Sequence, residues 1–248
     1  MKRLWLTSVL RLEPAMRRRW LAWTLGIFGL ALVALFPLRV ALGLSDLERI
    51  GFTARQVAGT IWYGRVGELH LRSQPLGTFE VQLDPLALLI GRISMSFDRT
   101  DDPQGLLEGR LVAGLRRGVK DASGRIAAGA MFAPLPIEAL EVDDLTVLFR
   151  NGRCVESSGR VTPVMAAPVP GVQFAGLTGT MQCDGERARV EMQSASGAER
   201  VDFYVHSSGR YRGWLSVRST APEVGAALSV LGFRPSPQGM TLTVNGRL

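Results

Sequence analysis

The stretch LTVLFRNGRCVESSGRV, residues 145–161, decides the fold. Apolar and polar residues alternate on each side of Asn151-Gly152, beginning with Leu145 and Val147. Such alternation is typical of a β-strand that buries one face, and Asn-Gly between two strands is a strong hairpin signal. The segment therefore predicts an antiparallel hairpin with one buried and one solvated face.

Two further turns have the same character. Asp184-Gly185 and Ser208-Gly209 each stand between strand-like runs, which predicts two more hairpins. The candidate strands along the chain are residues 57–63, 66–73, 77–83, 90–97, 106–113, 124–131, 140–149, 154–161, 174–183, 188–193, 201–206, 211–218 and 241–245. The predicted fold is mainly β: one or more antiparallel, strongly curved sheets built from hairpins, with one or two short helices, preceded by a single N-terminal transmembrane helix.

Two short helices interrupt the strand pattern. Asp84 is placed to cap a helix over residues 85–90, and a proline at the first helical position favours the same start. We expect this short apolar helix to pack in a core. The second helix is expected over residues 221–231, with Thr220 as its cap and Gly232 as its stop.

An uncharged stretch precedes the predicted sheet. The sequence WLAWTLGIFGLALVALFPL, residues 20–38, carries no charge over 19 positions, close to the roughly 20 that cross a bilayer as a helix. Trp20 and Trp23 at its start suit the membrane–water interface. A core helix would show a polar stripe, and a cleaved signal peptide would have small residues where Arg39 stands. We expect an uncleaved transmembrane helix over residues 20–42.

Charge predicts the orientation of this helix. Residues 1–19 hold six basic residues and one acidic residue, and so contribute most of the net charge of +7. Because basic flanks remain in the cytoplasm, we expect a cytoplasmic N-terminus and a periplasmic C-terminal domain in a bacterial inner membrane. The predicted organisation is a basic tail (1–19), the transmembrane helix (20–42), a juxtamembrane linker (43–56) and a periplasmic β-rich domain (57–248).

The periplasmic domain is expected to be nearly neutral. Its basic residues are interspersed with acidic ones and form no stripe with aromatic residues, so nucleic-acid binding is not expected. Residues 57–61 (VAGTI) resemble residues 177–181 (LTGTM). This short similarity leaves two tandem sheet modules open, with a boundary near 133–170.

Cys154 and Cys183 are the two cysteines of the chain. They form no CxxC pair and have no histidine close in sequence, so metal binding and thioredoxin-like chemistry are not expected. In an oxidising compartment such a pair is typical of a structural disulfide. The alternative is two separate buried thiols.

Catalytic motifs are absent from the sequence. His70 and His206 lie in alternating strand candidates, where solvated strand residues are the simpler interpretation. No GxSxG nucleophile, HExxH zinc pair or phosphate-binding loop occurs. We predict no catalytic residue, cofactor-binding residue or cofactor.

Two groups of acidic residues are interpreted without a metal. Asp98, Asp101 and Asp102 surround a turn but lack the ligand spacing of a calcium loop. Asp143 and Asp144 are adjacent in a strand, which directs them to opposite faces rather than into a cooperating pair. We therefore predict no metal site.

Several longer segments resemble a known family. They are residues 57–71 (VAGTIWYGRVGELHL), 76–97 (LGTFEVQLDPLALLIGRISMSF), 145–161, 177–185 (LTGTMQCDG) and 208–248, which contains GAALSVLGFR. With the basic tail and the apolar stretch before them, they resemble type II secretion system protein N, of the general secretion pathway protein N family. The segments GTIW and DPLALLIGR also resemble the β-sheet modules of AsmA-type envelope proteins.

The resemblance implies a non-enzymatic inner-membrane component of the type II secretion apparatus, which moves folded proteins out of the periplasm. Its implied partners are other inner-membrane subunits, the outer-membrane secretin and a second copy of the chain. The alternative is an AsmA-like periplasmic β-groove protein that handles lipid, and an envelope enzyme is a further rival. A lipid groove predicts an open apolar face, whereas a scaffold predicts a filled core.

Overall fold

The computed structural model describes residues 14–44, 52–71, 74–99, 105–127, 137–165, 176–219 and 221–247. Its helices are α1 (Pro14–Ala34), α2 (Leu38–Leu44), α3 (Pro85–Leu89) and α4 (Pro222–Val230). Its strands are β1 (Phe52–Gly59), β2 (Gly64–Leu71), β3 (Gln74–Leu83), β4 (Ile93–Arg99), β5 (Leu107–Ala113), β6 (Arg117–Ala127), β7 (Ile137–Arg150), β8 (Arg153–Met165), β9 (Thr178–Asp184), β10 (Arg187–Gln193), β11 (Glu199–His206), β12 (Arg210–Val217), β13 (Arg234–Ser236) and β14 (Gly239–Arg247).

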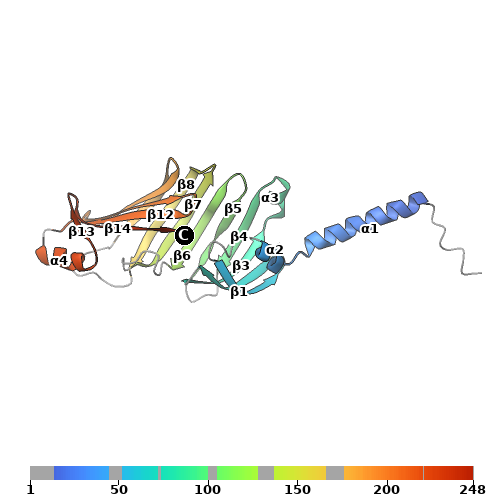
Figure 1. Ribbon diagram of the computed structural model, residues 1–248, viewed down its shortest axis with the longest axis horizontal. Helices are drawn as coiled ribbons and strands as arrows, with labels where there is room; N and C mark the ends of the chain where they lie inside the picture. The colour runs from blue at the N-terminus through green and yellow to red at the C-terminus, as the bar shows by residue number, and fades with distance from the viewer. Residues whose placement is uncertain are drawn as a thin grey trace, which may run out of the picture.

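The strands form one 14-stranded antiparallel sheet (Figure 1). Within the described residues, each strand pairs with its neighbour in sequence, except that β14 lies between β12 and β13. The three predicted hairpins are confirmed as β7–β8, β9–β10 and β11–β12. Asn151 and Gly152 join β7 to β8 with φ of 49° and 83°, the left-handed backbone that a tight Asn-Gly turn requires. The predicted mainly β, antiparallel fold is confirmed.

Three strands differ clearly from the expectation. β1 covers Phe52–Gly59 rather than residues 57–63, because the chain turns after Gly59, where the Thr60 N–H donates to the Tyr63 carbonyl (3.0 Å). β6 begins at Arg117 rather than at residue 124, because its pairing with β7 shifts on both sides of Ala122 and Asp121 has a φ of 51°. Such bulges interrupt the alternation by which a strand is recognised. β13 was not expected because it has three residues, among them Pro235, and therefore no alternating pattern.

The predicted strong curvature is wrong. The sheet is open, with β1 and β13 as its two edges, and it is not strongly curled (Figure 1). Hairpin turns determine which strands pair, but they do not determine how far a sheet bends. The sequence pattern therefore predicted the pairing correctly and the curvature incorrectly.

The predicted transmembrane helix over residues 20–42 is not found. α1 ends at Ala34 because the chain then joins the sheet: the Ile61 N–H donates to the Phe36 carbonyl (3.0 Å), and Pro37 forms an isolated bridge with Thr60. None of the helices that the structure describes is long and apolar enough to cross a membrane.

Both predicted short helices are present. The Asp84 carboxylate caps α3 by accepting hydrogen bonds from the N–H groups of Leu86 (2.9 Å) and Ala87 (3.3 Å). α4 ends before Gly232, whose φ of 90° suits a helix terminus. Its predicted cap, Thr220, lies outside the described residues.

The expectation that the first of these helices packs in a core is wrong. Of the residues of α3, only Ala87 is buried, whereas Leu86 and Leu89 are 72% and 83% exposed. α3 connects β3 to β4 at the end of the strands (Figure 1), where no second layer covers its other side chains. A helix of 5 residues has little more than one turn, so one face is all that it can bury.

The buried apolar side chains form one cluster along the sheet. In β10, the alternate residues Ala188, Val190 and Met192 are buried, as the pleat of a half-buried strand requires. At one end α2 adds Leu38 to the cluster, and at the other end α4 adds Leu228. The two helices therefore cover the ends of the core, and the sheet supplies the rest.

A buried arginine forms hydrogen bonds with several segments in the first half of the sheet. Arg99, at the end of β4, is 1% exposed. Its guanidinium donates hydrogen bonds to the backbone carbonyls of Gly105 (2.9 Å), Leu76 and Arg125, and it lies over the Phe79 ring. A buried guanidinium needs such partners, and these bonds join Arg99 to three separate chain segments.

We expect Arg99→Ala to lower the free energy of unfolding by about 3–5 kcal/mol, because a buried side chain is lost and three partly buried carbonyls lose a charged donor. Arg99→Met, which keeps much of the packing volume, should also destabilise, because it restores none of the three bonds. The measurement is urea denaturation of the full chain in detergent, with the exposed Arg218→Ala as the control. Equal stability of the Arg99→Met variant and the wild type would contradict this role.

Candidate functional site

Cys154 on β8 and Cys183 on β9 are joined by a disulfide, with 5.4 Å between their Cα atoms. β8 and β9 pair only at Arg160 and Val161, far along β8 from the cysteine. The disulfide, together with a hydrogen bond from the Cys154 N–H to the Gly185 carbonyl (3.0 Å), holds the other ends of these strands together. The disulfide thus connects the β7–β8 and β9–β10 hairpins at a place where β8 and β9 are not paired.

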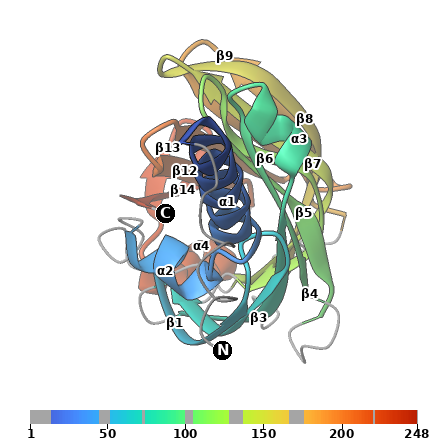
Figure 2. The same cartoon turned by 90° about the vertical axis from the view of Figure 1, so that its right-hand side faces the viewer.

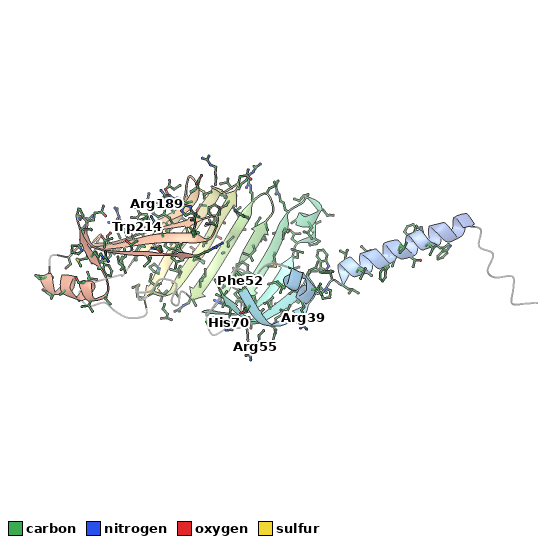
Figure 3. The ribbon with its side chains drawn as sticks, in the orientation of Figure 1. Arg39, Phe52, Arg55, His70, Arg189 and Trp214 are labelled. Carbon is green, nitrogen blue, oxygen red and sulfur yellow. A yellow bond between two sulfur atoms is a disulfide. The ribbon has the colours of Figure 1, made fainter. Side chains whose placement is uncertain are left out.

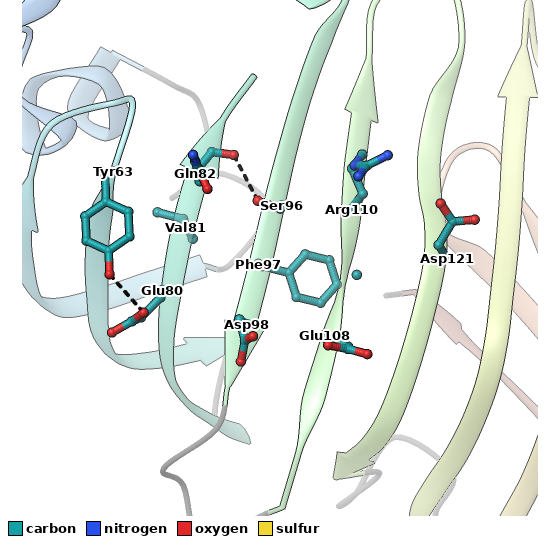
Figure 4. A pocket seen from close by; sticks show the side chains of 11 residues that line it. Tyr63, Glu80, Val81, Gln82, Ser96, Phe97, Asp98, Glu108, Arg110 and Asp121 are labelled. Carbon is teal, nitrogen blue, oxygen red and sulfur yellow. Dashed lines mark hydrogen bonds between the residues drawn. The ribbon is translucent and has the colours of Figure 1, made fainter. Parts of the chain in front are cut away.

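A shallow pocket of about 360 Å³ lies over β3, β4, β5 and β6 (Figure 4). Most of its polar side chains come from the sheet face opposite to that of the buried Phe79 and Val81. Tyr63, from the β1–β2 turn, closes one side and donates a hydrogen bond to the Glu80 carboxylate (3.1 Å). The pocket lining is Tyr63, Glu80, Val81, Gln82, Ser96, Phe97, Asp98, Glu108, Gly109, Arg110 and Asp121.

Three carboxylates form a row across this pocket. Asp98 is directly opposite Glu80 on one neighbouring strand and Glu108 on the other. Arg65 forms an ion pair with Glu80 (3.0 Å), but in the described part of the chain Asp98 and Glu108 have no ion pair. Like charges directly opposite one another destabilise a sheet. The row therefore presents negative charge that can attract a cationic partner group.

A second polar surface lies on β10, β11 and β12, around Arg189 and Trp214 (Figure 3). The rings of Tyr204 and Trp214 meet edge to face at 5.4 Å, and the Arg187 guanidinium lies 4.3 Å from the Tyr204 centroid. A hydrogen bond to Asp202 (2.7 Å) raises the pKa of Arg189. Tyrosine, tryptophan and arginine are the residues that most often anchor protein–protein contacts, so this surface is also suited to a protein partner.

The structure does not bring the histidines together with the acidic residues singled out in the sequence. His70 pairs with Thr53 near the first edge of the sheet, whereas His206 pairs with Arg187 on β10. Asp143 forms an ion pair with Arg160 (3.4 Å). No group of three histidine, cysteine or acidic residues among those described is placed to hold a metal ion.

Asp98 lies on β4, while Asp101 and Asp102 are outside the described residues. Asp144 has a φ of 52°, so it sits at a bulge and not in a regular strand as expected. The simple rule that adjacent strand residues face opposite sides does not apply at such a bulge.

Sequence reasoning missed the acidic row and the aromatic–arginine surface. The signal for the row was available in part, because each of its three acids lies in or next to a predicted strand. The pairing register, which places them opposite one another, was not available from the sequence. The Arg187–Tyr204 contact joins β10 and β11, so it too depends on a pairing register that was not available from the sequence.

The fold and these surfaces define an open antiparallel β-sheet protein with a disulfide between two hairpins. The family model for type II secretion system (T2SS), protein N, matches residues 51–243, and the chain belongs to this family. It is thereby assigned to the components of the type II secretion system, as the resemblance predicted. No curated protein and no solved structure matches the chain.

We expect loss of the disulfide to destabilise the protein. Replacing both Cys154 and Cys183 by serine should lower the free energy of unfolding by about 3–4 kcal/mol, since the bond closes a loop of 29 residues in the unfolded chain. Denaturation of the full chain measures this, and electrophoresis with and without reductant checks the bond itself. Identical mobility under both conditions would show that the bond does not form in solution.

We expect Asp98→Asn to stabilise the protein by about 0.5 kcal/mol at neutral pH, because it removes the middle charge of the acidic row. Asp143→Asn is the matched control: Asp143 faces Arg160 across the strands, so loss of its charge removes an attraction instead. Thermal unfolding of the two variants should shift in opposite directions. A lower melting temperature for Asp98→Asn would mean that its carboxylate has a stabilising partner.

Proposed function

We propose that the chain is a non-enzymatic part of the type II secretion apparatus and supports export of folded proteins through contacts with other subunits. Membership of the protein N family supports the place in the apparatus. An open sheet supports the mode of contact, because an exposed strand edge can accept a strand from a partner. The observation that carries this proposal is the difference between the two edges of the sheet.

The edge strand β1 lacks the usual protection against pairing. It has 8 residues, no proline and one charged residue, Arg55. The opposite edge strand, β13, has 3 residues and contains Pro235. Natural sheets shorten or interrupt an edge with proline to prevent pairing with other chains. β13 shows this design, but it covers only Gly239, Met240 and Thr241 of β14. β1 is the longer of the two edge strands and contains no proline, which makes it the better acceptor.

The pairing register indicates which groups β1 offers. The Thr60 N–H donates to the Tyr63 carbonyl (3.0 Å) and closes the β1–β2 hairpin. Backbone groups of alternate residues in an antiparallel pair point towards and away from the partner strand. Counting back from Thr60, the groups of Thr53, Arg55 and Val57 point away from β2, towards the free edge. A partner strand would bond to these residues.

Arg55→Pro tests the edge. Proline removes an N–H that points away from β2, so the sheet itself should remain intact, whereas a partner strand loses a donor and meets the proline ring. We expect secretion of the exported proteins to fall about tenfold or more, as for loss of one buried hydrogen bond plus a clash. Release of exoproteins into the medium by cells carrying only the variant is the measurement.

Arg55→Ala is the matched control. It removes the exposed ion pair of Arg55 with Glu68 (3.1 Å) and keeps the N–H, and surface pairs contribute little to stability. Normal secretion with Arg55→Pro would exclude strand addition at β1. Deletion of the gene tests the function as a whole: normal secretion combined with a leaky outer membrane would contradict the proposed role and favour lipid handling.

The packing of the second half of the sheet supports a scaffold over a lipid groove. A groove would leave its apolar face open, but Val190, Val217 and Leu228 are 2%, 1% and 1% exposed. These residues lie on β10, on β12 and on α4. The apolar space between them is filled by protein, so it offers no room for an acyl chain.

We infer association with the bacterial inner membrane and a periplasmic position for the sheet. The disulfide supports the periplasm, because disulfides persist in oxidising compartments. The side chains of α1 support contact with lipid: Trp23, Ile27 and Leu30 are 63–72% exposed along a helix that extends away from the sheet (Figure 1). Other inner-membrane subunits, the outer-membrane secretin and a second copy of the chain are the partners that we propose.

A further inference from the structure

Exposed apolar side chains gather at one end of the domain. Most of the large apolar side chains exposed beyond α2 lie on α3 and on the neighbouring ends of β4 and β5; the exceptions are Tyr63, Leu106, Val155 and Val230. We name Leu86, Leu89, Ile90 and Leu115 the apolar rim, and they are 67–83% exposed. A group of exposed apolar side chains at one place on the surface is typical of a contact site.

The turns that carry the apolar rim are neighbours. Ile93, after α3, pairs directly with Ala113, before Leu115. A Cβ atom placed on Gly114 would lie 3.5 Å from the Gly91 carbonyl oxygen. The α3–β4 turn and the β5–β6 turn are therefore neighbours, and the four exposed side chains come from adjacent segments.

Hydrogen bonds connect the apolar rim to the end of α1. The Leu83 N–H, just before α3, donates to the Ile61 carbonyl (3.2 Å), and the Trp62 indole donates to the Val33 carbonyl of α1 (3.0 Å). In the end view, α2 and α3 lie near the viewer together with α1, whereas α4 lies behind (Figure 2). The apolar rim is thus at the same end of the sheet as the exposed apolar helix.

Positive charge borders the apolar rim. Arg92 and Arg117, next to the two turns, are exposed and have no ion pair in the described part of the chain. Arg116 pairs with Glu156 (3.3 Å), and the nearby Asp84 carboxylate is occupied in capping α3. The acids around the rim are therefore engaged, and two arginines remain for an anionic partner.

We propose that the apolar rim rests on an anionic phospholipid bilayer, with its leucines in the boundary between headgroups and acyl chains and Arg92 and Arg117 on lipid phosphates. Exposed leucine and isoleucine beside arginine is the composition of interfacial membrane contacts, and anionic lipid attracts basic residues near its surface. The rim is a second membrane contact besides α1. It holds the sheet at a defined angle to the membrane, independently of the secretion role proposed above.

A fluorescent label tests this contact. Cys154 and Cys183 are bonded to each other and the described residues hold no free cysteine, so Leu89→Cys in the full chain can be labelled alone with the environment-sensitive dye NBD. In vesicles of phosphatidylcholine with phosphatidylglycerol, we expect a blue-shifted emission that lipids brominated on their acyl chains quench. Val230→Cys is the control, because Val230 is 89% exposed on α4, at the other end of the domain.

Two results would contradict the contact between the apolar rim and an anionic bilayer. Water-exposed emission of the label at residue 89, equal to that at residue 230, would overturn it and favour a protein partner for the rim. Charge reversal by Arg92→Glu with Arg117→Glu should reduce the ratio of inserted to exposed label by about tenfold or more in anionic vesicles. Insertion that responds neither to this reversal nor to omission of phosphatidylglycerol would overturn the anionic surface. Disulfide formation in each variant verifies that it has folded.

Discussion

The structure depends on one constraint, the pairing of almost every strand with its neighbour in the chain. In such a ladder, the turns that follow alternate strands lie on the same side of the sheet, where the strands end. This side holds the turn that is bonded to α1, the turns of the apolar rim and the two hairpin ends joined by Cys154–Cys183. One pairing rule thus places the disulfide, α3 and the attachment of α1 together, although up to about half of the chain separates them.

Features that depend on neighbouring residues were accessible from the sequence. The Asn151-Gly152 hairpin and the Asp84 cap of α3 each need a few adjacent residues, and both were predicted correctly. Arg99 was not predicted, because its three carbonyl partners come from distant segments. The apolar stretch at residues 20–38 was misread for a related reason: its charge-free length indicated one helix, but Pro37 pairs with Thr60 of a later segment and so ends the helix early. In both cases the deciding contacts join residues that are far apart in the sequence.

Two surface features are unfavourable in an isolated chain, one through repulsion of like charges and the other through its readiness to pair with other chains. The row of Glu80, Asp98 and Glu108 places like charges opposite one another, and β1 leaves backbone groups of an eight-residue edge without a strand partner in the described structure. Stabilising substitutions at such places are easy to make and are often costly to function. Surfaces of this kind suit the proposed contacts with other subunits, and the buried core together with Arg99 stabilises the fold that carries them.

The position of β1 relates the two proposed contacts. The sheet runs from β1, beside α2 and the end of α1, to β13 and α4 at the far end (Figure 1). A strand added at β1 would therefore join at the end that carries the apolar rim. If the rim lies on the membrane, the free edge is held close to the bilayer surface, where inner-membrane subunits emerge. A partner segment near its own membrane anchor then meets the edge at a high effective concentration, so weak strand pairing suffices for assembly.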